Sequence, residues 1–180
     1  IGIQKKSKEA IEKKCCELDP DGLENYLLIK YRADDGVGTM KVNERFLKMV
    51  GVTEEEAWDK AMQNICKDTV IESMDKIFSE AMGTPYDPDA EPVIPLYIIS
   101  SKENIKGASS ILNREKLKEF GEKYGVKQLL VIPSSIHEML ISPYTDWMEM
   151  DQMKAMVREV NEKEVLPEER LTDQAYIVTL

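Results

Sequence analysis

Two short apolar runs constrain the fold of this chain more than any other feature. They lie at residues 93–99 and 128–132, and in neither do apolar and polar positions alternate. Such runs are typical of strands that are buried on both faces of a sheet. Between the runs, apolar residues at helical spacing predict a helix that starts at Asn113 and ends before Gly125. The sequence therefore predicts a central strand–helix–strand unit, with a right-handed crossover by default.

The flanking sequence adds further elements. Thr53 with Glu56, and Thr69 with Glu72, are capping-box signatures and predict two helices that meet near Asp68. Periodicity and turn residues predict five more elements: a helix over 3–18, a β-hairpin over 26–42, a short helix from 43 to 51, a Met-rich helix over about 148–162 and a final strand over 174–180.

Together these elements predict a mixed α/β (α+β) fold with about five strands in a mixed sheet and five or six helices. A chain of 180 residues is long enough to bury one core, so we expect a single domain over residues 1–180. Residues 83–92, which are rich in proline and acidic side chains, are the candidate for an internal boundary. Because the chain begins at Ile1 rather than Met, we expect it to be the C-terminal part of a longer protein.

The charge balance argues against polyanionic partners. The chain carries 24 Lys and Arg residues against 34 Asp and Glu residues, a formal net charge of −10. A nucleic-acid backbone or an anionic membrane surface requires clustered positive charge, and the largest excess of it, in residues 93–132, is only 7 basic against 4 acidic residues. No apolar run reaches the ~20 residues that a membrane span needs. We therefore expect a cytoplasmic protein that binds neither nucleic acid nor membrane.

Metal and disulfide chemistry have little support in the sequence. Cys15, Cys16 and Cys66 are odd in number and lack a CxxC spacing, which predicts reduced thiols. His137 is the only histidine, and with Glu138 beside it the chain shows no recognisable set of metal ligands. We expect no metal and no cofactor.

The densest polar motif spans residues 133–138 and directly follows a predicted buried strand. Strand ends in open α/β sheets are common ligand sites. A hydrolase or transferase would use Ser134 or Ser135 as the nucleophile and His137 as the base. The orienting acid would be Asp146, Asp151 or Asp173.

The same motif has a structural interpretation, which we favour. Ser135 and Glu138 form another S-x-x-E capping box and predict a helix start with His137 on its surface. Residues within one helical turn rarely align as a nucleophile and its base. The catalytic candidates, if the chain is an enzyme, are Ser134, Ser135, His137, Glu138 and Asp173.

A second candidate site is the loop from Lys102 to Ser110, after the first predicted central strand. Backbone N–H groups and lysine side chains there could hold an anion, with Lys102, Lys106, Gly107 and Ser109 as the binding candidates. No nucleotide-binding glycine motif is present, so a plain connecting loop is the more conservative interpretation.

Four methionines lie within nine residues of the chain, at positions 148, 150, 153 and 156. Flexible thioethers suit adaptable binding surfaces, and Trp147 would be a natural anchor there. Core filling on an amphipathic helix is the interpretation we favour.

Several segments resemble an uncharacterised domain-of-unknown-function family of Gram-positive anaerobic bacteria. They are LYIISS, NIKGASSIL, LLVIPSSIHEML and MVREVNEKEVLPEERLTDQAYIV. The resemblance covers residues 96–178, extends more weakly to 26–64, and implies relatives that are longer at the N-terminus. It implies no reaction, cofactor or partner. Its recurrent features fall at Gly107, Ala108, Pro133, Ser134, Ser135, His137, Glu138, Asn161, Asp173 and Tyr176.

Capping or loop chemistry accounts for every polar cluster, and none assembles a nucleophile, a base and an orienting group. We therefore expect a non-enzymatic cytoplasmic binding or interaction module, with an unknown protein partner or self-association. The alternatives are a small hydrolase or transferase that uses Ser134 or Ser135 with His137, and an anion-binding regulatory domain that uses the Lys102–Ser110 loop.

Overall fold

The computed structural model describes residues 1–180 with the exception of 35, 89, 91, 94 and 146–148. Helices and strands are both present, which confirms the mixed α/β class. The largest sheet has the strand order β10-β8-β9-β7-β6. Its strands are β6 (Thr69–Ser73), β7 (Tyr97–Ser101), β8 (Gln128–Ile132), β9 (Glu138–Pro143) and β10 (Tyr176–Thr179).

The predicted strand–helix–strand unit consists of β7, α4 (Arg114–Tyr124) and β8. Its two strands run in the same direction, but they are not neighbours, because β9 lies between them and pairs antiparallel with both. Every pairing between the described strands of this sheet is antiparallel, whereas the sequence pattern predicted a mixed sheet. The physical reason is that the chain turns back after β8 and forms a hairpin with β9. Strand β9 therefore occupies the position next to β7 that β8 would take in a parallel pair.

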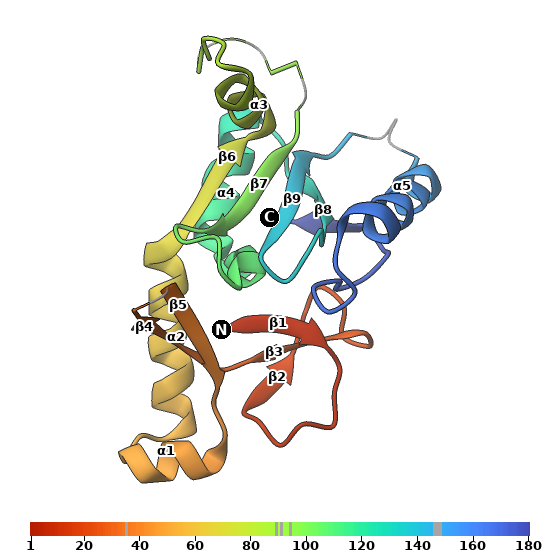
Figure 1. Ribbon diagram of the computed structural model, residues 1–180. Coiled ribbons are helices and arrows are strands. Elements are labelled where there is room, and N and C mark those ends of the chain that lie inside the picture. The colour runs from red at the N-terminus through yellow and green to blue at the C-terminus, as the bar shows by residue number, and fades with distance from the viewer. Residues whose placement is uncertain (35, 89, 91, 94, 146–148) are drawn as a thin grey trace.

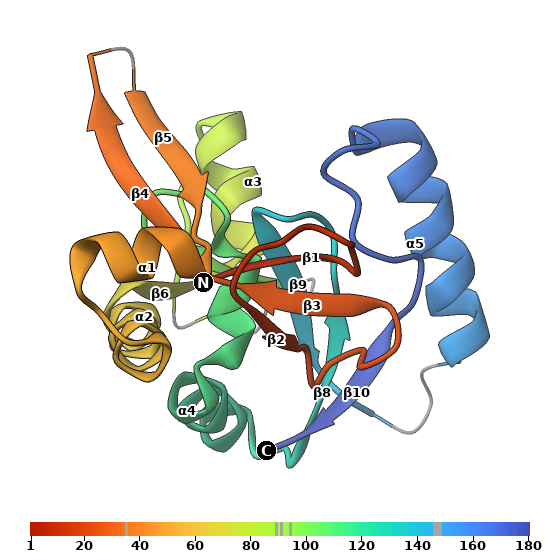
Figure 2. The same cartoon turned by 90° about the horizontal axis from the view of Figure 1, so that it is seen from below.

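Two layers cover the large sheet, one on each face (Figures 1 and 2). On one face Leu129 and Val131 of β8 belong to a core cluster that includes Leu117 of α4. The 3₁₀-helix η1 (Gly107–Leu112) also packs on this side. On the other face Leu130 packs with Val157 of α5 (Met150–Glu164). Consecutive side chains of β8 thus enter two different cores, which explains the apolar run without alternation.

Residues 3–18 do not form the predicted helix. They contribute β1 (Gly2–Lys5) and β2 (Lys13–Cys15), which flank β3 (Leu23–Tyr26) in a three-stranded antiparallel sheet. Two apolar residues of this segment, Ile3 and Cys16, enter the main core from extended segments rather than from one face of a helix. Strand pairing with residues 9 to 24 positions away prevails over local helix propensity.

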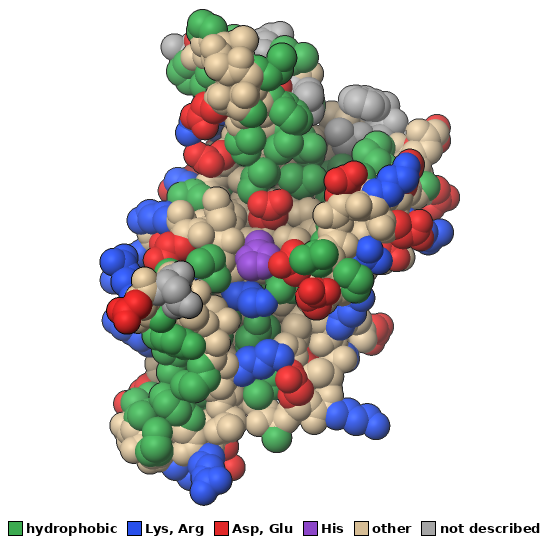
Figure 3. All heavy atoms as spheres, in the orientation of Figure 1, with side chains coloured by type: hydrophobic (Ala, Val, Ile, Leu, Met, Phe, Trp, Pro, Cys, Tyr) green, Lys and Arg blue, Asp and Glu red, His purple; other side chains and the backbone are tan. Residues whose placement is uncertain are grey.

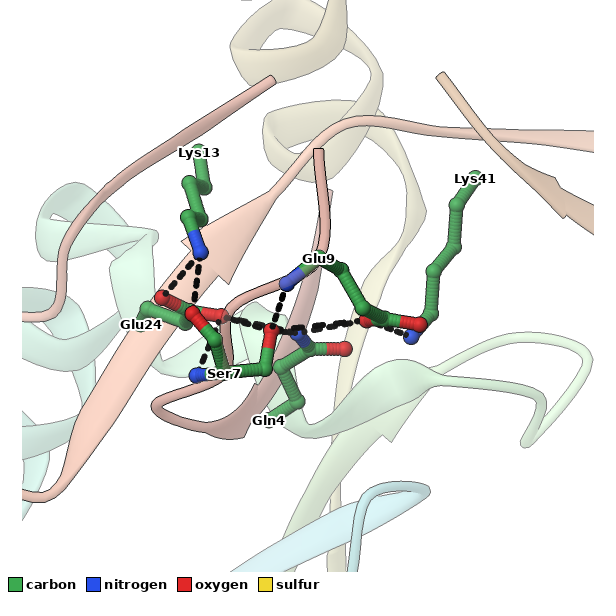
Figure 4. A network of polar contacts seen from close by, with 6 residues as sticks. All are labelled: Gln4, Ser7, Glu9, Lys13, Glu24 and Lys41. Carbon is green, nitrogen blue, oxygen red and sulfur yellow. Dashed lines mark hydrogen bonds and ion pairs between the residues drawn. The ribbon is translucent and has the colours of Figure 1, made fainter. Parts of the chain in front are cut away.

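Polar contacts tie this small sheet to its surroundings, as Figure 4 shows. The buried Glu24 carboxylate accepts hydrogen bonds from Gln4 Nε2 at 2.8 Å and Ser7 Oγ at 2.8 Å, and lies 3.3 Å from Lys13 Nζ. Burial raises the pKa of Glu24, but these donors outweigh it and hold that pKa below its ordinary value. A neighbouring pair, Glu9 with Lys41, links the same loop to the next hairpin.

Several local predictions are confirmed. The hairpin is formed by β4 (Leu28–Ala33) and β5 (Gly36–Lys41), although Asp35 in its turn lies outside the described residues. Asn43 caps α1 (Glu44–Val50) and Gly51 ends it with φ of 70°. Thr53 and Glu56 form both capping-box bonds at the start of α2 (Glu54–Asp68). Asn113 and Gly125 bound α4 as predicted.

The prediction that Thr69 and Glu72 form a capping box at the start of a helix is wrong. These residues lie in β6 and pair with β7 over its whole length, and α3 (Met74–Met82) begins only after Ser73. Thus β6 and β7 pair across the 83–92 connector, of which residues 89 and 91 lie outside the described part. Strand β7 starts at Tyr97, later than the apolar run predicted, and Val93 is 89% exposed.

Two further elements that the sequence predicted near the C-terminus are confirmed. The Met-rich helix α5 and the final strand β10 are both present, whereas Trp147 and Met148 lie outside the described residues. Cys15, Cys16 and Cys66 are free thiols. No helix in the described part of the chain is long and apolar enough to cross a membrane.

Candidate functional site

The polar motif at residues 133–138 forms the loop of the β8–β9 hairpin. The predicted capping box there is wrong, because no helix follows and β9 begins at Glu138. Ser135 Oγ instead accepts a hydrogen bond from the His137 backbone N–H at 3.0 Å, and Ser134 Oγ donates to the Glu138 carbonyl at 3.1 Å. Because Met139 and Ile141 are buried alternately against β7, strand formation prevails over the local helix signal.

The His137 imidazole bridges two other segments. Its Nε2 lies 3.3 Å from Glu169 Oε1, in the segment after α5. Its Nδ1 lies 3.3 Å from the Lys106 backbone nitrogen and 3.2 Å from the Asn104 carbonyl oxygen. His137 is the only histidine in the sequence, and in Figure 3 it is the purple side chain near the centre of the visible face, among acidic and basic side chains. The imidazole therefore has an acidic partner, but a different one from those that the sequence indicated.

The predicted catalytic residues do not gather around the imidazole. Neither Ser134 nor Ser135 has a hydrogen bond to the ring in the described structure. Asp173 accepts a hydrogen bond from Asn161 Nδ2 at 2.8 Å. Asp151 is exposed on the first turn of α5, and Asp146 lies outside the described residues.

Glu138 is half-buried next to this loop, and burial raises the pKa of its carboxyl group, while His137 acts in the opposite direction. Glu169 carries no signal by which sequence reasoning could have found it, since it lies in an irregular segment rich in glutamate. In the described part of the chain, no three His, Cys, Asp or Glu side chains gather as a metal site requires.

The second predicted site opens into a cavity of about 540 Å³. Strand β4, helix α2, the loop after β7 and η1 line it, and they lie below the large sheet in the view of Figure 1. Three of the four predicted binding candidates, Lys102, Lys106 and Ser109, are lining residues. Lys30 of β4 and Lys67 of α2 also line the cavity. The sequence did not indicate them because both are distant along the chain from the Lys102–Ser110 loop.

Gly107, the fourth candidate, holds the loop tightly against β7. A Cβ atom at this position would lie 2.2 Å from Ser100 Oγ and 2.5 Å from the Ser101 backbone nitrogen. Residues 104 and 106, which precede it, both adopt φ of 52° although neither is glycine. Strained backbone of this kind is concentrated at functional sites.

The cavity has a positive electrostatic character. Its lining includes four lysines, at positions 30, 67, 102 and 106, against a single acidic residue, Asp68. Lys30 Nζ donates to Ser101 Oγ at 3.3 Å and lies 3.7 Å from the Glu103 carboxylate. The other three lysines have no ion-pair partner within 4.0 Å in the described part of the chain. Burial lowers the pKa of Lys106, an effect that the Glu169 carboxylate opposes.

Fold and site together define a mixed α/β domain with a lysine-lined cavity beside its main sheet. The chain belongs to a family of unknown function, DUF5688, whose model matches residues 25–178. Comparisons with curated proteins and with solved structures gave no match. The family match includes Lys30, the Lys102–Ser110 loop and the 133–138 motif.

Proposed function

We propose that this chain is a non-enzymatic binding module that takes a small anionic ligand in the lysine-lined cavity. The observation that carries the proposal is the concentration of four lysines against one aspartate around one cavity, in a chain with a net charge of −10. A concave site lined by one sign of charge focuses the field and attracts counter-ions. Ammonium groups bind phosphate and carboxylate as point charges.

The lining also indicates what else the ligand carries. Leu28, Ile29 and Ile65 line the cavity together with the lysines. The volume of about 540 Å³ lies in the range of small-molecule sites. A ligand with one anionic group and an apolar portion would use both kinds of lining, whereas an inorganic anion would use only the lysines.

A small hydrolase or transferase is the second candidate, and the contact between His137 and Glu169 favours it. A carboxylate that orients an imidazole is part of nucleophilic catalysis. Against it, the hydroxyl groups of Ser134 and Ser135 bond to the backbone of their own loop. A protein partner and self-association stay predictions. So do the bacterial origin that the resemblance implied and the cytoplasmic location that charge and hydropathy implied.

The test is isothermal titration calorimetry of the chain with two probes. Pyrophosphate is purely anionic, whereas phenyl phosphate carries an apolar ring beside its phosphate group. We expect saturable binding of both, tighter for phenyl phosphate, and weaker at high salt because screening reduces charge attraction. Lys30→Gln and Lys106→Gln should each weaken binding several-fold. Lys60→Gln is the matched control, since Lys60 is exposed on α2 and does not line the cavity.

The proposal fails if neither probe binds saturably, or if Lys30→Gln and Lys106→Gln bind as tightly as the parent chain. Turnover of an ester substrate that disappears in His137→Ala would support the hydrolase instead.

A further inference from the structure

A second cavity, of about 250 Å³, lies on the opposite face of the large sheet, between that face and α5. Figure 2 shows α5 alongside β8 and β9, away from the layer that contains α4. The lining is aliphatic: Leu130 and Ile132 come from β8, Leu140 from β9, and Met153 and Val157 from α5. Met156 and Val160, also lining residues, are 52% and 45% exposed, so the cavity opens to solvent along α5.

One polar group in this lining lacks a partner. Asn161 is 1% exposed, and its Nδ2 donates to the Thr172 carbonyl at 3.0 Å and to Asp173 Oδ1 at 2.8 Å. Both of those atoms are acceptors, so the orientation of the carboxamide is set. Its oxygen has no hydrogen-bond partner in the described structure. Because this oxygen is not fully sealed from solvent, it remains an acceptor that a ligand in the cavity can reach.

We infer that this cavity binds a small, mainly apolar molecule that donates one hydrogen bond to the Asn161 carboxamide oxygen. The aliphatic lining selects an apolar body, and the carboxamide selects a single N–H or O–H group. A cavity of about 150 Å³ holds benzene, so this one has room for about nine or ten non-hydrogen atoms. Indole meets all three requirements. Met153 and Met156 are flexible enough to adapt to the outline of such a ligand.

The experiment follows backbone amide NMR signals of the whole chain during titration with indole and with benzothiophene. The two probes have nearly the same shape, but benzothiophene has no N–H group. We expect saturable shifts in α5, β8 and β9 with indole, and roughly five- to tenfold weaker binding of benzothiophene, the effect of one hydrogen bond.

Variants locate the site. Val160→Phe should fill the cavity and abolish indole binding without loss of stability, and Leu140→Phe fills it from β9 if the first variant fails to fold. Met49→Phe, an exposed position on α1, is the matched control and should bind as the parent does.

Three outcomes would overturn the inference. They are no saturable shift at millimolar indole, equal binding of the two probes, and unchanged binding in the filled variants. A dimer that dissociates in Val160→Phe would mean that a second copy, rather than a small molecule, occupies the cavity.

Discussion

At the residue scale, Lys106 illustrates how a binding site conflicts with stability. Lys106 lines the cavity, and burial lowers the pKa of its ammonium group because the charged form loses hydration. The charged form is therefore less favourable in the folded chain than in the unfolded chain. Such a group is costly to folding, and anion binding, the proposed function, would account for its presence.

We expect Lys106→Gln to raise the free energy of unfolding at neutral pH, while it weakens anion binding. A lysine with a lowered pKa destabilises the fold below that pKa, so the gain should disappear as pH rises through it and the native lysine loses its charge. Urea unfolding of parent and variant between neutral and alkaline pH measures this. A variant less stable than the parent at neutral pH would contradict it, and Lys60→Gln is the control.

At the element scale, the same short signature produces different structures. The pattern of Ser or Thr with Glu three residues later predicted helix starts at Thr53, Thr69 and Ser135, and of these only Thr53 starts a helix with both capping bonds. At the other two sites a strand forms, because the following residues pair with β7. A capping box stabilises a helix by about 1 kcal/mol, which several ladder hydrogen bonds and buried side chains exceed.

Removal of the hydroxyl group should therefore have unequal effects. We expect Thr53→Ala to lose about 1 kcal/mol and to lower the melting temperature by roughly 2–4 °C, because α2 loses its N-terminal cap. Ser135→Ala removes a single turn contact in a partly exposed loop and should cost less. Thermal unfolding of both variants checks this. Equal losses would mean that the loop depends on Ser135 as strongly as α2 depends on its cap.

At the scale of the whole molecule, the Glu24 network holds together the three strands of the N-terminal sheet and the loop between β1 and β2. The carboxylate is 6% exposed and holds β1, the following loop and β2 through Gln4, Ser7 and Lys13. This sheet contributes Ile3 and Leu23 to the main core. Loss of the carboxylate charge would therefore affect the packing between the two sheets.

The lowered pKa of Glu24 makes this contribution depend on pH. Its stabilisation is present above the ordinary carboxyl pKa of about 4.5 and is lost as pH falls through the lower folded value. We expect Glu24→Gln to lower the free energy of unfolding by roughly 1–3 kcal/mol at pH 7, and by less at an acidic pH at which the native carboxylate is protonated. Urea unfolding at both pH values measures the difference. Glu9→Gln, at an exposed position, should change stability little, and a Glu24→Gln loss that is the same at both pH values would refute this account.

What the sequence by itself determined are the features that depend on neighbours within a few residues. The caps of α1, α2 and α4 and the β4–β5 hairpin were predictable, because a side chain and the backbone groups it bonds lie within one turn. The Lys102–Ser110 loop could be singled out as a candidate site because its lysines and small residues are close together in the sequence.

Only the tertiary structure decided the rest. Residues 2–5 and 69–73 became strands, and β9 begins at Glu138 in place of a helix, because the strands they pair with lie far along the chain and no local pattern encodes a distant partner. Lys30 and Lys67 reached the cavity from separate elements, and Glu169 reached His137 from an irregular segment. Hydrogen bonds and burial between distant segments exceed local preferences in free energy, and for this reason the complete set of residues at each candidate site emerged only from the folded chain.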